Sequence, residues 1–170
     1  MEGSNPPFFM EEIKVIDKFL TEKEMEEVWE FINNMSWTTQ HSIPGESTID
    51  FLESDVTCVE YFNSYLFNRI RDILNIDVKL DRVYFNGQWN GREGDFHTDS
   101  CDVTALIYLS YYEPHWGGFT QILLPDEKEE IISPQQGRLM SFPSKCLHKG
   151  YSFVYQECPM RISLAYKMNF

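Results

Sequence analysis

The sequence has few basic residues, and this shortage argues against two classes of partner. Lysine and arginine number 14 against 27 aspartates and glutamates, which gives a formal net charge of −13 and a pI near 4.6. A surface this acidic repels phosphate groups and anionic lipid headgroups. We therefore expect neither a nucleic acid nor a membrane to be a partner of this protein.

Long apolar runs, a secretion signal and paired cysteines are also missing. No stretch approaches the roughly 18 consecutive apolar residues that a membrane-spanning helix needs, and the first residues lack a basic region followed by an apolar core. The four cysteines, at positions 58, 101, 146 and 158, form no C-x-x-C pair and no disulfide framework. Because unpaired thiols are typical of reducing compartments, we expect a cytoplasmic protein.

What the sequence does contain is a high share of aromatic residues, which favour β-strands. Phe, Tyr and Trp make up 15% of the 170 residues, and this length suits a single domain, 1–170, with a sizeable core. Apolar or alternating stretches separated by Gly, Pro and Asn predict strands near residues 78–86, 103–111, 119–124, 129–133, 138–142, 147–154 and 160–168. We therefore expect residues 76–170 to form a mainly β sandwich or barrel, with helices packed on one face.

Residues 1–75 have a different texture and are expected to be a helical support region for this β core. Residues 11–20 predict a short strand that leads into a helix. Thr21 and Glu24 form a capping-box pattern, in which each side chain bonds the backbone of the other, so the first helix should begin here and end near Asn34.

A polar segment, residues 36–54, follows the first helix and contains His41. Pro44 and Gly45 mark a turn within it. We expect a long irregular connection, which is either an ordinary surface loop or a lid over a site. A second helix should then run from about residue 56 to residue 74, because apolar residues recur there with helical spacing.

The stretch that points to chemistry is Asp95-Phe96-His97-Thr98-Asp99. On a strand or in an extended loop, residues two apart point to the same side, so His97 and Asp99 face a common point. With a second histidine they would complete a set of two imidazoles and one carboxylate, which typically holds non-haem Fe(II) and leaves positions open. An H-x-D pair also arises by chance, so its meaning depends on residues further along the chain.

His148 is the candidate for the second histidine, although a histidine in an apolar strand can also be a purely structural residue. Further on, Arg161 and Ser163 share one face of the last predicted strand. A guanidinium stays charged when buried, so an inward-facing arginine needs an anion. Either an internal carboxylate or the carboxylate of a ligand can supply it.

Taken together, these features resemble a known family. The features in chain order are H-x-D at 97–99, the strand 104–110, the turn Trp116-Gly117-Gly118, the strand 137–142, His148 and Arg161. This order resembles the Fe(II)- and 2-oxoglutarate-dependent dioxygenases, and among them the prolyl 4-hydroxylase-like subgroup. The resemblance covers about residues 82–170. It implies a double-stranded β-helix, which is a cupin-like jelly roll with supporting helices.

The resemblance also implies roles for matching residues. The metal ligands, which form the catalytic centre, would be His97, Asp99 and His148. The residues that bind the cosubstrate 2-oxoglutarate would be Arg161, Ser163, Tyr108 and Tyr84. For both tyrosines, ordinary packing in the core is the alternative. The cofactors implied are Fe(II), 2-oxoglutarate and O₂, and ascorbate is a further candidate.

The activity implied is hydroxylation of a prolyl or other peptide residue, coupled to oxidative decarboxylation of 2-oxoglutarate to succinate and CO₂. Ser110 stands where the family usually has asparagine, and Arg161 where many prolyl hydroxylases have lysine. The partner can therefore be a peptide or a small molecule such as a free amino acid. Two other classes stay open at this point: a metal-binding cupin-like module without redox chemistry, and a zinc hydrolase that activates water with the same ligands.

Overall fold

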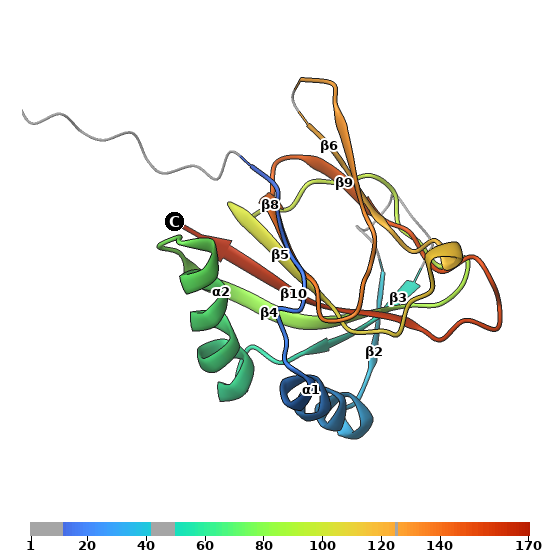
Figure 1. Ribbon diagram of the computed structural model, residues 1–170, viewed down its shortest axis with the longest axis horizontal. Helices are drawn as coiled ribbons and strands as arrows, with labels where there is room; N and C mark the ends of the chain where they lie inside the picture. Colours follow the sequence, from blue (N-terminus) through green and yellow to red (C-terminus); the bar gives the residue numbers. More distant parts are fainter. Residues whose placement is uncertain (1–11, 42–49, 125) are drawn as a thin grey trace, which may run out of the picture.

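The computed structural model describes residues 12–41, 50–124 and 126–170, without the side chains of residues 40, 41 and 50. Within these residues, two antiparallel sheets face each other, and the helices cover the outer face of the larger one (Figure 1). The larger sheet has seven strands in the order β1-β8-β5-β10-β4-β3-β2, and the smaller has three in the order β7-β6-β9. This arrangement is a double-stranded β-helix, or jelly roll, and it confirms the expected mainly β fold.

The strands of the larger sheet are β1 (Lys14–Ile16), β2 (Thr38–His41), β3 (Asp50–Asp55), β4 (Lys79–Gln88), β5 (Val103–Tyr108), β8 (Leu139–Pro143) and β10 (Arg161–Asn169). The strands of the smaller sheet are β6 (Thr120–Leu123), β7 (Glu129–Ile132) and β9 (Leu147–Gly150). Every strand expected after residue 77 forms, and each begins and ends within a few residues of its predicted bounds.

The first helix, α1 (Glu22–Asn34), begins where the sequence predicts. The Thr21 hydroxyl accepts a hydrogen bond from the Glu24 backbone N–H (3.2 Å), and the Glu24 carboxylate accepts one from the Thr21 backbone N–H (2.8 Å). The capping box is therefore complete, and it fixes the start of α1 through side chains that are only three residues apart.

The second helical stretch starts later than expected and changes character along its length. A π-helical segment, η1 (Tyr61–Leu66), runs directly into α2 (Phe67–Leu74). The expected start, Val56, is instead tied to the sheet, because its backbone N–H donates to the carbonyl of Val83 (3.0 Å). A short 3₁₀ helix, η2 (Pro114–Trp116), precedes β6. No helix among the described residues is long and apolar enough to cross a membrane.

The two main helical segments are joined by a buried carboxylate. Glu24 of α1 accepts hydrogen bonds from the Tyr65 hydroxyl (2.7 Å) and from the Arg69 guanidinium, and we call these three residues the helix clasp. Burial alone would raise the pKa of Glu24, but the hydrogen bonds from Thr21, Tyr65 and Arg69 lower it to about 2. The clasp therefore depends on an ionised carboxylate.

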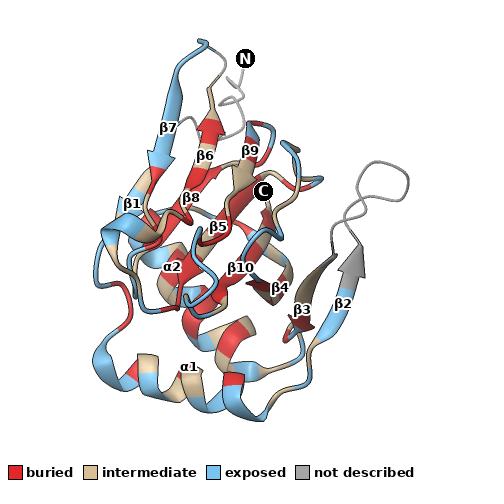
Figure 2. Cartoon of the chain, turned by 90° about the vertical axis from the view of Figure 1, so that its right-hand side faces the viewer, coloured by how far each residue is buried: buried red, intermediate tan, exposed pale blue. Residues whose placement is uncertain are grey.

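Alternation along the strands of the larger sheet separates an apolar face from a polar one. On β10, the residues Ile162, Leu164, Tyr166 and Met168 all belong to the main core. Figure 2 shows that buried residues gather on the central strands of this sheet and on the helices. A second, smaller core lies between the sheets and consists of Tyr108, Ile122, Ile132, Met140, Phe142 and Cys146. The remaining inner face of the larger sheet is free to carry polar side chains.

Residues 36–54 depart from the expected irregular connection. Their ends pair as the antiparallel strands β2 and β3, and β3 in turn pairs with β4, so they widen the larger sheet. Their polar sequence concealed this, because such strands are stabilised by pairing with distant residues and not by an apolar pattern of their own. With β1 as well, three strands lie in the region expected to be helical support. Pro44 and Gly45 lie outside the described residues, as does the side chain of His41.

Candidate metal centre and its cavity

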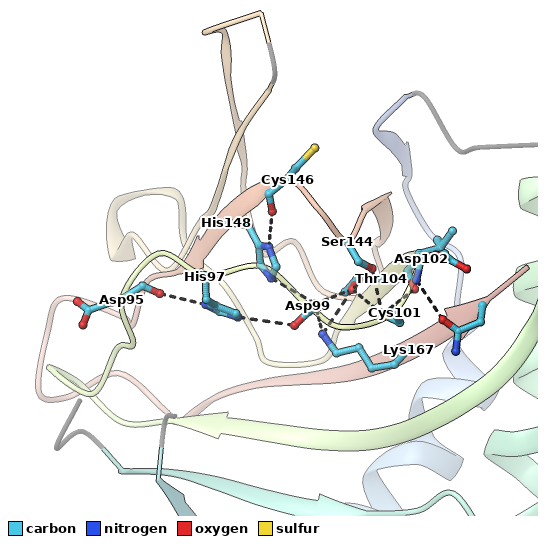
Figure 3. Close-up of polar contacts among 12 residues, drawn as sticks. Asp95, His97, Asp99, Cys101, Asp102, Thr104, Ser144, Cys146, His148 and Lys167 are labelled. Carbon is cyan, nitrogen blue, oxygen red and sulfur yellow. Dashed lines mark hydrogen bonds and ion pairs between the residues drawn. The ribbon is translucent and has the colours of Figure 1, made fainter. Parts of the chain in front are cut away.

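His97, Asp99 and His148 converge on one point (Figure 3). His97 and Asp99 lie between β4 and β5, while His148 lies on β9. Their ligand atoms all lie within 4.8 Å of one another. The backbones of the two histidines are bridged reciprocally, since each N–H donates to the other's carbonyl at 3.0 and 2.9 Å. The structure therefore brings together the three metal ligands that the sequence predicts.

Both histidines are held in the tautomer that a metal requires. The Nδ1 atom of His97 lies 3.0 Å from the carbonyl of Asp95, and that of His148 lies 2.9 Å from the carbonyl of Cys146. A carbonyl only accepts, so each Nδ1 carries the proton and each Nε2 keeps its lone pair for a metal. Burial lowers the pKa of His97, which favours the neutral ring that coordinates metals.

The two oxygens of Asp99 have different surroundings. Oδ2 accepts a hydrogen bond from the Thr104 hydroxyl (2.6 Å), contacts the ammonium of Lys167 and lies 3.4 Å from His148 Nε2. Oδ1 has no donor among the described residues and lies 3.9 Å from His97 Nε2. Burial alone would raise the pKa of Asp99, but contacts with His148 and Lys167 hold it well below its usual range. The carboxylate is thus ionised, and one oxygen is left for a metal.

The triad lines a cavity of about 400 Å³ together with the inner face of the larger sheet. Strand register builds the floor of this cavity in rows. Glu53, Asn86 and Ser163 are direct neighbours on β3, β4 and β10, and Arg82 and Lys167 are direct neighbours four residues further along β4 and β10. All five side chains line the cavity. The floor therefore suits a polar, charged ligand.

Arg161 lies at the start of β10 and is only 3% exposed, yet its side chain lines the same cavity. The guanidinium donates to three uncharged oxygens: Gly118 O (2.7 Å), Gln88 Oε1 (2.7 Å) and Thr120 Oγ1 (3.1 Å). It forms no ion pair with any carboxylate in the described part of the chain. A guanidinium has more N–H groups than these three bonds use, so donors remain for an anionic ligand.

The other three predicted cosubstrate residues differ in their access to the cavity. Ser163 and Tyr84 line it, and burial is the main cause of a raised pKa for Tyr84. Tyr108 does not line it. Its ring lies beneath the Arg161 guanidinium (5.4 Å from Cζ to the ring centroid), and its hydroxyl donates to Thr120 Oγ1 (2.8 Å). Tyr108 therefore acts on the cavity through the residues it supports.

Comparisons with known proteins identify the fold. No protein-family model matches the chain, and no curated protein matches it by sequence. Among solved structures, an oxidoreductase of the 2OG-Fe(II) oxygenase family from Burkholderia pseudomallei matches with a TM-score of 0.75 at 11% identity, over 92% of this chain and 85% of that one. A prolyl-4-hydroxylase from Pseudomonas putida matches with a TM-score of 0.68 at 19% identity, over 91% of both chains. The fold is that of the 2-oxoglutarate/Fe(II) oxygenases.

A third neighbour with the oxygenase fold is a prolyl hydroxylase from Trichoplax adhaerens, in complex with a peptide fragment of the oxygen degradation domain of hypoxia inducible factor. Its TM-score is 0.73 at 15% identity, over 92% of this chain and 83% of that one. At this level of identity the likeness concerns the fold.

Sequence reasoning missed several residues that this oxygenase fold brings to the site. They are Gln88, Thr104, Thr120 and Lys167. For Lys167 a signal existed, because the period of two along β10 places it on the same face as Arg161 and Ser163. For the others the contacts cross between strands, and a single sequence does not specify which residues become neighbours across a sheet.

Proposed function

We propose that this protein is an Fe(II)- and 2-oxoglutarate-dependent dioxygenase. His97, Asp99 and His148 would hold the iron, and Arg161 would bind the far carboxylate of 2-oxoglutarate. When bound, the iron would supply O₂ activation coupled to oxidative decarboxylation of 2-oxoglutarate, which yields succinate, CO₂ and a hydroxylated substrate. The observation that carries the proposal is Arg161, a buried cation without an acidic partner among the described residues, in the same cavity as the metal ligands.

The donor set suits this metal. Two imidazole Nε2 atoms with fixed tautomers and one free carboxylate oxygen are the donors that bind non-haem Fe(II) on one side and leave the other side open. A zinc hydrolase or a plain metal-binding module could use the same three ligands. Neither would need a buried guanidinium with spare donors in the same cavity, so Arg161 favours the oxygenase.

The residues around Arg161 would prepare it for a carboxylate. Gln88, Thr120 and the Gly118 carbonyl hold the guanidinium in one orientation, so little rotational freedom is lost when a ligand binds. Burial excludes water from the pair, and a charge-assisted bond in such surroundings is strong. Ser163 and Tyr84 would contribute further polar contacts to the cosubstrate from the floor of the cavity.

For the substrate we propose a peptide residue, with proline as the first candidate. The Trichoplax neighbour was solved with a peptide fragment, and two prolyl hydroxylases share the fold. A small molecule is the second candidate, because a neighbour from Streptomyces hygroscopicus was solved with hygromycin B. Phe51 and Phe96 line the same cavity and offer apolar contacts near the metal ligands. Incubation with a peptide library and with free amino acids would separate the two, since only the true class gains the mass of one oxygen atom.

The decisive experiment measures turnover of 2-oxoglutarate to succinate in the presence of Fe(II). We expect turnover, even without the true substrate, and we expect Arg161→Ala to need far more 2-oxoglutarate while still binding metal. Arg92→Ala, an exposed arginine outside the cavity lining, is the matched control and should behave like the wild type. Absence of decarboxylation together with absence of 2-oxoglutarate binding would reject the proposal. An unchanged requirement in Arg161→Ala would reject the role of that residue.

A further inference from the structure

Lys167 lines the cavity together with the cations Arg82 and Arg161, and the proposed function does not use it. Its side chain is only 14% exposed, and its ammonium contacts Oδ2 of the metal ligand Asp99 and lies 3.4 Å from the Thr104 hydroxyl (Figure 3). Along β10 it shares a face with Arg161, because the two are separated by an even number of residues. Lys167 therefore extends its charge into the metal site from beneath.

The two oxygens of Asp99 have different partners and are therefore expected to have different roles. Thr104 and Lys167 both donate to Oδ2, which also lies 3.4 Å from His148 Nε2. Oδ1 accepts no hydrogen bond from the described residues and lies 3.9 Å from His97 Nε2, so it is the oxygen that we expect a metal to use. Thr104 is neutral and only orients the carboxylate, and Val would keep its shape without the hydroxyl. Lys167 also carries a full positive charge. Its ammonium contacts Oδ2, the oxygen of Asp99 that is not expected to bind the metal.

That charge has two opposite consequences. The ammonium of Lys167 repels a divalent cation in the site. It also cancels the negative charge of Asp99, so the net charge of the metal-loaded site would be +2, whereas it would be +1 without Lys167. The first effect weakens metal binding. The second strengthens binding of an anion to the loaded site, because the anion is attracted by both the metal and Lys167.

We propose that Lys167 is a charge-setting and positioning residue: it holds Asp99 with Oδ1 toward the metal and shifts the site from metal affinity toward anion affinity. The expected effect of Lys167 on anion binding rests on the proposed function, in which 2-oxoglutarate is the anion. The expected effect of Lys167 on metal binding does not depend on the proposed function. Thr104 shares the positioning role but not the charge, so the two residues are expected to affect metal binding in opposite directions.

The experiment titrates Mn²⁺ alone into the purified protein by calorimetry, and then titrates 2-oxoglutarate into the Mn²⁺-loaded protein without O₂. For Lys167→Met we expect Mn²⁺ to bind about tenfold more tightly and 2-oxoglutarate about tenfold more weakly. For Thr104→Val we expect Mn²⁺ to bind about tenfold more weakly, as is usual when a partner of a metal ligand is lost. Lys167→Arg should restore both affinities, and Lys79→Met, which removes an exposed lysine, should change neither.

Each outcome decides the inference. A purely structural role for Lys167 predicts weaker binding of both Mn²⁺ and 2-oxoglutarate in Lys167→Met, and that result overturns the proposal, as does unchanged binding of Mn²⁺. If the wild type binds Mn²⁺ but no 2-oxoglutarate, the proposed function and the expected effect on anion binding are both wrong. The expected effect on metal binding is then still decided by whether Lys167→Met binds Mn²⁺ more tightly or more weakly than the wild type. Circular dichroism of each variant identifies one that has not folded. If Lys167→Met does not fold, Lys167→Gln, which keeps a polar donor but not the charge, takes its place and must show the same opposite changes in the two affinities.

Discussion

Replacing Arg161 with methionine removes a buried charge that no acidic side chain in the described residues balances. When one partner of a buried ion pair is removed, the charge left behind costs about 3–5 kcal/mol of stability. Arg161→Met leaves only uncharged oxygens, on Gly118, Gln88 and Thr120. The loss of three hydrogen bonds from a charged donor, each worth about 1.5–3 kcal/mol net, is largely offset by relief of the several kcal/mol that burial of the guanidinium costs.

The expected change in the free energy of unfolding is therefore no more than about 2 kcal/mol, because these terms oppose each other. The affinity for 2-oxoglutarate should fall much more. A charge-assisted pair in a buried site is worth about 3 kcal/mol or more, which corresponds to at least a hundredfold loss of affinity. Denaturant unfolding measures the first quantity, and calorimetric titration of 2-oxoglutarate into the Mn²⁺-loaded protein measures the second.

Arg82→Met is the matched control, because Arg82 lines the same cavity but pairs with the carboxylates of Glu53 and Asp55. Its removal leaves the buried Glu53 without its cation, so it should reduce stability more than Arg161→Met does. Its effect on 2-oxoglutarate affinity should be the smaller of the two. The reasoning is refuted if Arg161→Met is the more destabilising variant and retains its affinity for 2-oxoglutarate.

Two further predictions concern the fold around the site. Glu24→Gln should lower the free energy of unfolding at pH 7 by up to about 3 kcal/mol. The folded-state pKa of Glu24 is depressed from 4.5 to about 2, so this stability is present above pH 4.5 and is lost as pH falls toward 2. Glu26→Gln, at an exposed position, is the control. An equal loss of stability in the control, or a loss in Glu24→Gln that does not vary with pH, would contradict this. Gly118→Ala should destabilise the protein more than Gly91→Ala does, and the midpoint of denaturant unfolding measures the difference. Both glycines have positive φ, but a Cβ at Gly118 would lie 2.5 Å from the Phe153 ring, whereas Gly91 has open space, and equal losses would show that the ring yields freely.

The parts that sequence predicted well are those set by local or periodic rules. The capping box of Thr21 and Glu24 needs only residues three apart, and it formed as expected. His97 and Asp99 face one point because they are two residues apart. Arg161 is buried without a carboxylate partner in the described residues, which favours the ligand among the two alternatives for its anion.

The parts that were missed depend on which distant residues become neighbours. The pairing of β2 with β3 and of β3 with β4 is not visible in polar segments that carry no apolar alternation. Tyr108 has the strand position that the resemblance suggests, but only the packing shows Thr120 between its hydroxyl and the cavity. Lys167 belongs to no motif of the sequence, since nothing near it indicates that Asp99 is its partner.

The reciprocal backbone bridge between His97 and His148 also has a consequence for motion. Each residue supplies both a donor and an acceptor, so the segment that carries His97 cannot lift away from β9 without breaking both bonds together. A metal held by both side chains would act as a cross-link that closes a loop of about 50 residues, as a disulfide does. Metal loss and opening of this segment would then be one event, and the bound ion would hold the segment against β9 in addition to serving as a reactive centre.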